Sequence, residues 1–114
     1  MTDILKAAFI FVAPKSNAQT HSAWVNTEHV HVKTIAVSNY QQGCDILDGL
    51  YAEGIRAIEL CAGFGHQGVA RIVEAVAGRM AVGVVRFDIH PLLGFQSGDN
   101  LNDHHAADIA STGS

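Results

Sequence analysis

Residues 55–68, IRAIELCAGFGHQG, constrain the fold of this chain more than any other segment. Their first half is mostly apolar and predicts a short buried strand, and the glycine-rich half predicts a loop that opens a helix. A strand, a glycine loop and a helix in this order form the unit from which α/β proteins build binding sites. The glycines allow close approach to the backbone, and the first turn of the helix offers unpaired N–H groups to an anion.

Four apolar segments rich in Val, Ile and Phe have the composition of strands that are buried in a sheet. These strands are expected at residues 5–13, 30–37, 55–61 and 80–87. The second strand alternates polar and apolar residues at its start, as an edge strand does.

Helices are expected between the later strands. Asn39 can cap a helix, since Gln42 follows it at the capping-box spacing, and Gly54 is suited to end that helix. Apolar residues at helical spacing predict a second helix from about residue 68 to residue 77. The polar segment 17–29 could hold a short third helix.

Strands that alternate with helices predict right-handed βαβ units and a parallel sheet. We therefore expect an α/β fold, a small three-layer sandwich around a four-stranded parallel sheet in the flavodoxin-like strand order 2-1-3-4. A half-barrel with the order 1-2-3-4 is the alternative. Residues 1–95 are expected to form one domain, and the polar residues 96–114 a flexible tail.

The composition excludes several classes of protein. With 48% hydrophobic residues the body of the chain is not disordered, and a net charge of −4 gives no electrostatic footprint for nucleic acid or an anionic membrane. No apolar run reaches the roughly 18 residues of a membrane-spanning helix. Cys44 and Cys61 form no CxxC pair, which favours reduced thiols and a cytoplasmic protein.

A binding site in an open parallel sheet lies outside the carboxyl ends of the strands. The segment from Gly63 to Gly68 fits the spacing GxGxxG, and Asp88 follows 20 residues later, where a ribose-binding acid would stand. The chain lacks the second half of a dinucleotide-binding fold, so a small anion or a plain tight turn are the stronger readings. The candidate ligand-binding residues are Gly63, Phe64, Gly65, His66, Gly68 and Arg86.

Four side chains at the same strand ends are candidates for acid, base or nucleophile chemistry, and they are Glu59, Cys61, Asp88 and His90. Alternatively, Glu59 and Arg86 form a structural ion pair between two strands, and Cys61 is a buried apolar cysteine. Asp88 and His90 could hold a metal with His66 or Glu59, but no tight ligand spacing supports this. We expect no metal site, and the sequence assigns no cofactor.

Two blocks, residues 57–66 (AIELCAGFGH) and 83–91 (GVVRFDIHP), together with residues 6–14, resemble a family of short bacterial proteins of unknown function. The resemblance covers roughly residues 5–95 and implies no reaction. From the residues we expect a small-molecule binding domain that holds an anion or carboxylate on the glycine loop. A small enzyme using the four side chains above and an interaction protein without a ligand are the alternatives, so enzymatic activity is left open.

An apolar cluster follows the last predicted strand and suggests self-association. A domain of this size buries a modest fraction of its surface, so exposed apolar side chains near its end favour a homo-oligomer. The cluster consists of Phe87, Ile89, Leu92, Leu93 and Phe95.

Overall fold

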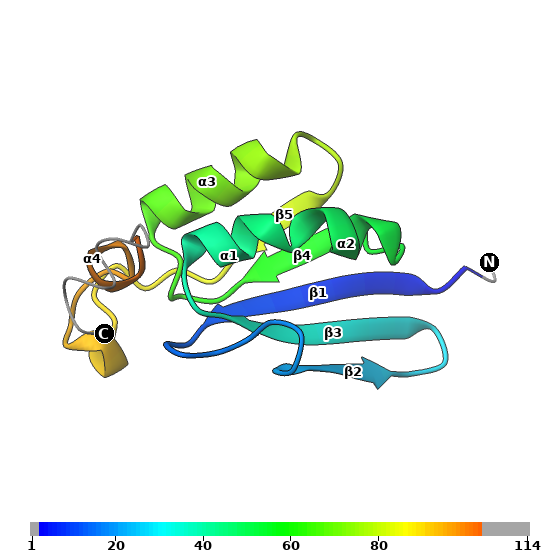
Figure 1. Ribbon diagram of the computed structural model, residues 1–114, viewed down its shortest axis with the longest axis horizontal. Helices are drawn as coiled ribbons and strands as arrows, with labels where there is room; N and C mark the ends of the chain where they lie inside the picture. The colour runs from blue at the N-terminus through cyan, green and yellow to red at the C-terminus, as the bar shows by residue number, and fades with distance from the viewer. Residues whose placement is uncertain (1–2, 104–114) are drawn as a thin grey trace.

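A computed structural model describes residues 3–103 and confirms an α/β fold (Figure 1). One sheet contains five strands: β1 (Leu5–Val12), β2 (Ser22–Asn26), β3 (Val30–Val37), β4 (Ala57–Leu60) and β5 (Ala81–Val84). The helices are α1 (Tyr40–Asp45), α2 (Leu47–Ala52), α3 (His66–Val76) and the short α4 (Asp99–Asn102), with a 3₁₀ turn at Pro91–Leu93.

The expectation of a four-stranded, wholly parallel sheet is wrong. The strand order is β2-β3-β1-β4-β5, and β2 runs antiparallel to β3 while the other neighbours are parallel. The difference arises in segment 17–29, which forms β2 and a tight turn instead of a helix. Thr27 closes that turn, because its hydroxyl donates to the Val30 carbonyl at 2.8 Å and accepts from the Val30 amide at 3.0 Å.

Because segment 17–29 forms a strand and not a helix, one of the three expected layers is absent from the described part of the chain. The connection from β1 to β3 carries a strand at the sheet edge, so it supplies no helix for the second face. Helices α1, α2 and α3 all lie on the same side of the sheet (Figure 1). The fold is therefore a two-layer sandwich, and the half-barrel alternative is not found either.

The core lies between the sheet and its helices. Ile10 of β1, Ile58 of β4 and Ile72 of α3 are fully buried there, and Tyr40 and Phe64 stack with ring centroids 5.2 Å apart. The predicted N-cap of α1 is present, since the Asn39 side chain accepts from the Gln42 amide at 2.8 Å, but the Gln42 side chain accepts from the Ser38 amide at 2.9 Å and not from the Asn39 amide as in a capping box. The expected single helix is divided at Ile46 into α1 and α2.

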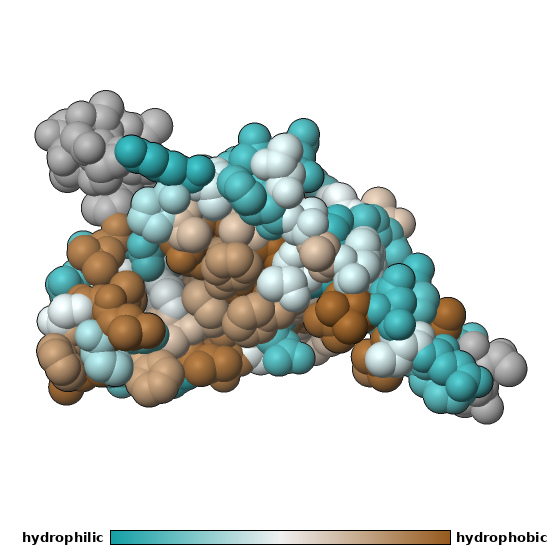
Figure 2. All heavy atoms as spheres, turned by 90° about the horizontal axis from the view of Figure 1, so that it is seen from below, coloured by the Kyte–Doolittle hydropathy of each residue, from teal (hydrophilic) through white to brown (hydrophobic). Residues whose placement is uncertain are grey.

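The opposite face of the sheet is covered by no described helix. Side chains alternate along a strand, and Ile10, Ile35 and Ile58 point into the core. Their strand neighbours therefore face the other way, and among them are Phe9, Phe11, Val32, Thr34 and Glu59. Seen from below, apolar side chains occupy the middle of the molecule and its left end (Figure 2). None of the helices within residues 3–103 combines the length and apolarity needed to cross a membrane.

Helix α3, which carries the glycine loop at its start, ends in a strained residue. Ala77 has φ 53°, a left-handed conformation that costs an L-residue about 1–2 kcal/mol. We expect Ala77→Gly to raise the free energy of unfolding by about 0.5–1 kcal/mol, because glycine adopts this conformation without strain and its greater freedom in the unfolded chain offsets only part of that gain.

The matched control is Ala70→Gly, an exposed position inside α3. Glycine there should lower the free energy of unfolding by about 1 kcal/mol. Urea unfolding monitored by circular dichroism measures both variants. Equal destabilisation by the two substitutions would contradict the strain at Ala77.

Candidate functional site

The glycine loop lies where expected, at the carboxyl end of β4. The chain turns after Leu60, and α3 begins at His66 with Gly65 as its N-cap. Phe64 is only 1% exposed and belongs to the core, so it anchors the loop and is not available to a ligand. The carboxyl ends of β1, β3 and β4 meet at the left end in Figure 1, where α4 also lies.

The loop glycines are explained by close packing. A Cβ on Gly68 would lie 2.5 Å from the ring of Tyr40, and one on Gly65 would lie 2.5 Å from the Asp99 carboxylate carbon. A Cβ on Gly98 would collide with the Gly63 carbonyl. The spacing GxGxxG therefore lets α1 and the segment around Gly98 approach the loop.

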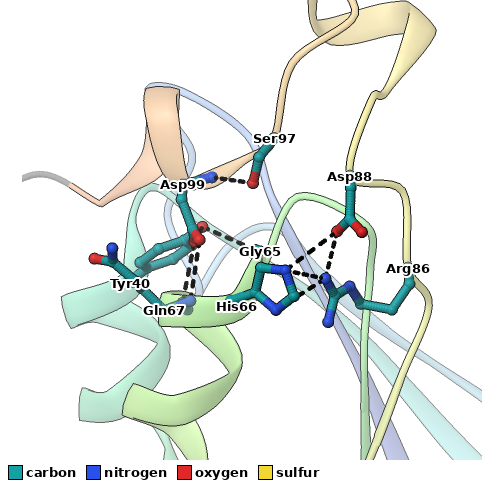
Figure 3. Close-up of polar contacts among 9 residues, drawn as sticks. Tyr40, Gly65, His66, Gln67, Arg86, Asp88, Ser97 and Asp99 are labelled. Atoms are coloured by element: carbon teal, nitrogen blue, oxygen red, sulfur yellow. Dashed lines mark hydrogen bonds and ion pairs between the residues drawn. The ribbon is translucent and has the colours of Figure 1, made fainter.

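The N-terminus of α3 already holds a carboxylate, that of Asp99 (Figure 3). Asp99 Oδ2 accepts from the Gln67 amide at 3.0 Å, and Oδ1 accepts from the Gly68 amide at 3.2 Å. The Tyr40 hydroxyl donates to Oδ1 at 2.7 Å and accepts from the Gly65 amide at 3.1 Å. In other helices the side chain of the N-cap residue accepts from the amides at the positions of Gln67 and Gly68. Gly65 has no side chain, so Asp99 caps the helix from a distant part of the sequence.

Asp99 belongs to residues 96–103, which we call the strap. Asp99 N donates to Ser97 Oγ at 3.1 Å, and Asn102 Nδ2 donates to the Gly63 carbonyl at 2.9 Å. Arg71 of α3 pairs with Asp103 at 2.8 Å. The expected flexible tail is thus packed against the loop over these residues, and residues 104–114 lie outside the described part of the chain.

The contacts of Asp99 shift two pKa values in opposite directions. Burial alone would raise the pKa of Asp99, but hydrogen bonds from the Gln67 amide, the Tyr40 hydroxyl and the Gly68 amide bring it below its usual range. The pKa of Tyr40 is raised, mainly by burial and further by the adjacent Asp99 carboxylate. Tyr40 therefore stays a neutral donor to a charged carboxylate.

A second polar cluster stands beside the loop and joins three of the expected residues (Figure 3). Arg86 Nη2 lies 3.0 Å from Nδ1 and 2.8 Å from Nε2 of His66, and it donates to Asp88 Oδ1. His66 Nε2 lies 3.8 Å from the same Asp88 oxygen. The Arg86 hydrogen bond, followed by the charges of Arg86 and His66, lowers the pKa of Asp88.

The other candidates do not join this cluster. Strand β5 ends at Val84, so Arg86 lies beyond the sheet and pairs with Asp88, while Glu59 points to the uncovered face of β4. Cys61 Sγ accepts from the Gly63 amide at 3.2 Å. His90 Nδ1 accepts from the Leu92 amide at 3.1 Å, and its ring lies 4.8 Å from that of Phe87, so it shapes the turn that leads into the strap.

Within residues 3–103, no three His, Cys, Asp or Glu side chains are grouped closely enough to hold a metal ion. A recess of about 570 Å³ opens elsewhere, between the β2–β3 edge and helices α1 and α2. Lys33 and Glu53, which pair at 2.9 Å, line it together with Ile35 and Leu50, and no expected site residue borders it. We therefore place the candidate site at the Arg86 cluster.

Sequence reasoning missed Tyr40, Ser97 and Asp99. Tyr40 has the spacing of a core residue, and residues 96–103 have the composition of a tail. Two features of the sequence could have indicated this contact. The helix begins at a glycine and has no acidic residue nearby to cap it, and a later Ser-Gly-Asp sequence marks a place where the chain can bend sharply.

We expect Asp99→Ala to lower the free energy of unfolding by about 0.5–2 kcal/mol at neutral pH, the usual effect of removing an N-cap. The folded-state pKa of Asp99 is lowered, so its carboxylate stabilises the fold above its usual pKa of 3.8 and loses this effect as the pH falls through the lowered value. Urea unfolding of both proteins from neutral pH down to below pH 3.8 measures this difference.

The neighbouring Asn100→Ala is the control, because Asn100 is exposed and its side chain bonds only weakly to Gln96. It should change stability little at any pH. A loss for Asp99→Ala that is unchanged at acid pH would contradict the role of the charged carboxylate.

No curated protein and no solved structure matches this chain. A family described only as a family of unknown function, DUF6506, matches residues 5–100. The matched region includes the five strands, the glycine loop, the Arg86 cluster and Asp99. The chain belongs to this family of unknown function, DUF6506.

Proposed function

We propose that this protein is a small-molecule binding domain, and that it takes a small carboxylate or phosphate at Arg86 and His66, beside the glycine loop. The proposal moves the expected anion site from the loop amides to the rim of the loop. The amides of Gln67 and Gly68 hold the Asp99 carboxylate and offer nothing to a ligand while the strap is in place.

The unused donors of Arg86 carry this proposal. All hydrogen bonds that the guanidinium makes to described residues leave from Nη2, so Nε and Nη1 are without a partner in the described part of the chain. The Arg86 side chain is 35% exposed, and that of His66 is 72% exposed. Nε and Nη1 lie on different edges of the guanidinium, so each can donate one charge-assisted hydrogen bond to an oxygen of a carboxylate or a phosphate.

Asp88 and Asp99 limit the charge that such a site tolerates. Asp88 already neutralises part of the Arg86 charge, and Asp99 lies on the other side of His66. The ring nitrogens of His66 lie within 3.0 Å of Arg86 Nη2. A small ligand with one or two negative charges therefore fits better than a polyanion.

Binding is favoured over catalysis by the positions of three of the four candidate catalytic residues, since of the four Asp88 alone joins the Arg86 cluster. In the described part of the chain, no hydrogen bond joins Cys61 to a histidine or a carboxylate, and His90 is engaged with the Leu92 amide. Glu59 faces the opposite side of the sheet. A nucleophile, a base and an orienting group therefore do not come together.

The test is a thermal-shift titration with inorganic phosphate, acetate, malonate and succinate, each against chloride at equal ionic strength. A ligand that binds the folded state raises the melting temperature with its concentration. We expect at least one of the four anions to do so, and Arg86→Gln to remove the response.

Arg56→Gln is the matched control, because Arg56 is an exposed arginine at the start of β4, bonded to the Tyr51 and Ile55 carbonyls. It should keep the response. An Arg86→Gln variant that responds like the wild type would overturn the site, and no response to any of the four anions would overturn the ligand class.

A further inference from the structure

We infer that two copies of this chain associate through the uncovered face of the sheet, which becomes the centre of a four-layer dimer with the helices outside. This inference does not depend on the anion site. On this uncovered face, which we call the open face, four large apolar side chains lie close together on adjacent strands: Phe9, Phe11, Val25 and Val32.

Register places these side chains next to one another. Phe9 of β1 is paired with Thr34 of β3 on one side and with Glu59 of β4 on the other. Val25 of β2 is paired with Val32 and is 65% exposed. In Figure 2, apolar side chains continue from the middle of this face to the end of the molecule. Four side chains of the expected apolar cluster are strongly exposed: Phe87 48%, Ile89 67%, Leu92 86% and Phe95 70%.

The area of the face is that of a protein interface. A strand spacing of about 4.8 Å and a rise of about 3.3 Å per residue give a sheet roughly 20 Å wide and, along β1 and β3, roughly 26 Å long. That outline is on the order of 500 Å² per partner, or about 1,000 Å² for two copies, which is the lower limit for a specific interface. The largest apolar patch on a typical monomer measures about 300–600 Å² and is often functional.

The charge of the face favours a second copy over other occupants. Among the strand residues that point to this side in the described chain, Glu59 is the one ionisable group. A surface without lysine or arginine has nothing to attract an anionic membrane. Residues 104–114, which lie outside the described part of the chain, contain a single large aliphatic side chain, Ile109.

A two-fold axis satisfies the packing requirements of such a face. Two sheets that pack face to face lie about 10 Å apart and interdigitate their side chains. The same apolar patch meets itself, as in most homodimers. Glu59 is then partly desolvated without a cation on its own face, so it weakens the association that the apolar side chains drive.

The test measures association of the wild type by sedimentation equilibrium across the micromolar range. We expect a species of twice the 12.1 kDa of one chain. Thr34→Glu places a charge in the middle of the proposed interface and should raise the dissociation constant by about tenfold or more. Glu59→Gln removes the desolvated charge and should lower the dissociation constant.

Val73→Glu is the matched control, because Val73 is 49% exposed on α3, on the helix side of the sheet. It should leave the dissociation constant unchanged. Circular dichroism reports whether the Thr34→Glu variant folds. If that variant is unfolded, the lower dissociation constant expected for Glu59→Gln still tests the interface. A monomeric wild type, a dimer indifferent to both face variants, or a dimer dissolved by Val73→Glu would each overturn the inference.

Discussion

The carboxyl edge of this protein depends on a single carboxylate. Asp99 satisfies the first amides of α3 and the hydroxyl of Tyr40, which in turn binds the Gly65 amide. Through these contacts the strap, α1 and the glycine loop are held as one unit. A helix N-terminus that elsewhere would bind an external anion is used here to fix the chain's own last described helix. Because Asp99 occupies the Gln67 and Gly68 amides, the proposed ligand site is Arg86 with His66.

The second constraint is that helices cover one face of the sheet, whereas no described helix covers the other. Because the link from β1 to β3 is a strand, helices α1, α2 and α3 pack on one face, and Ile10, Ile58 and Ile72 form the core there. The other face keeps Phe9 and Phe11 without a covering layer in residues 3–103. The proposed anion site and the proposed dimer face are tested by different variants, Arg86→Gln for the first and Thr34→Glu for the second.

The parts of the fold that sequence predicted are those encoded by local pattern. The strand expected at residues 55–61, which is β4 (Ala57–Leu60) in the structure, the glycine loop and the amphipathic α3 were found because period, turn residues and caps are local signals. Strand β2 was missed, since its Trp24 and Val25 are exposed at a sheet edge and give no clear period. In the site, Arg86, Asp88 and His66 do meet, but Asp99 reaches α3 over more than 30 residues, and no local pattern encodes such a contact.

The central claim is that the loop amides are occupied by Asp99 and that a ligand meets Arg86 instead. Two-dimensional ¹H–¹⁵N NMR during a phosphate titration tests it most directly, in the wild type and in Asp99→Asn. In the wild type the account predicts shifts of the Arg86 side-chain Nε–H signal and of the His66 amide, with Gln67 and Gly68 unmoved. In Asp99→Asn, where the competing charge is gone, Gln67 and Gly68 should respond as well. A wild-type response centred on Gln67 and Gly68, with Arg86 unmoved, would contradict the account.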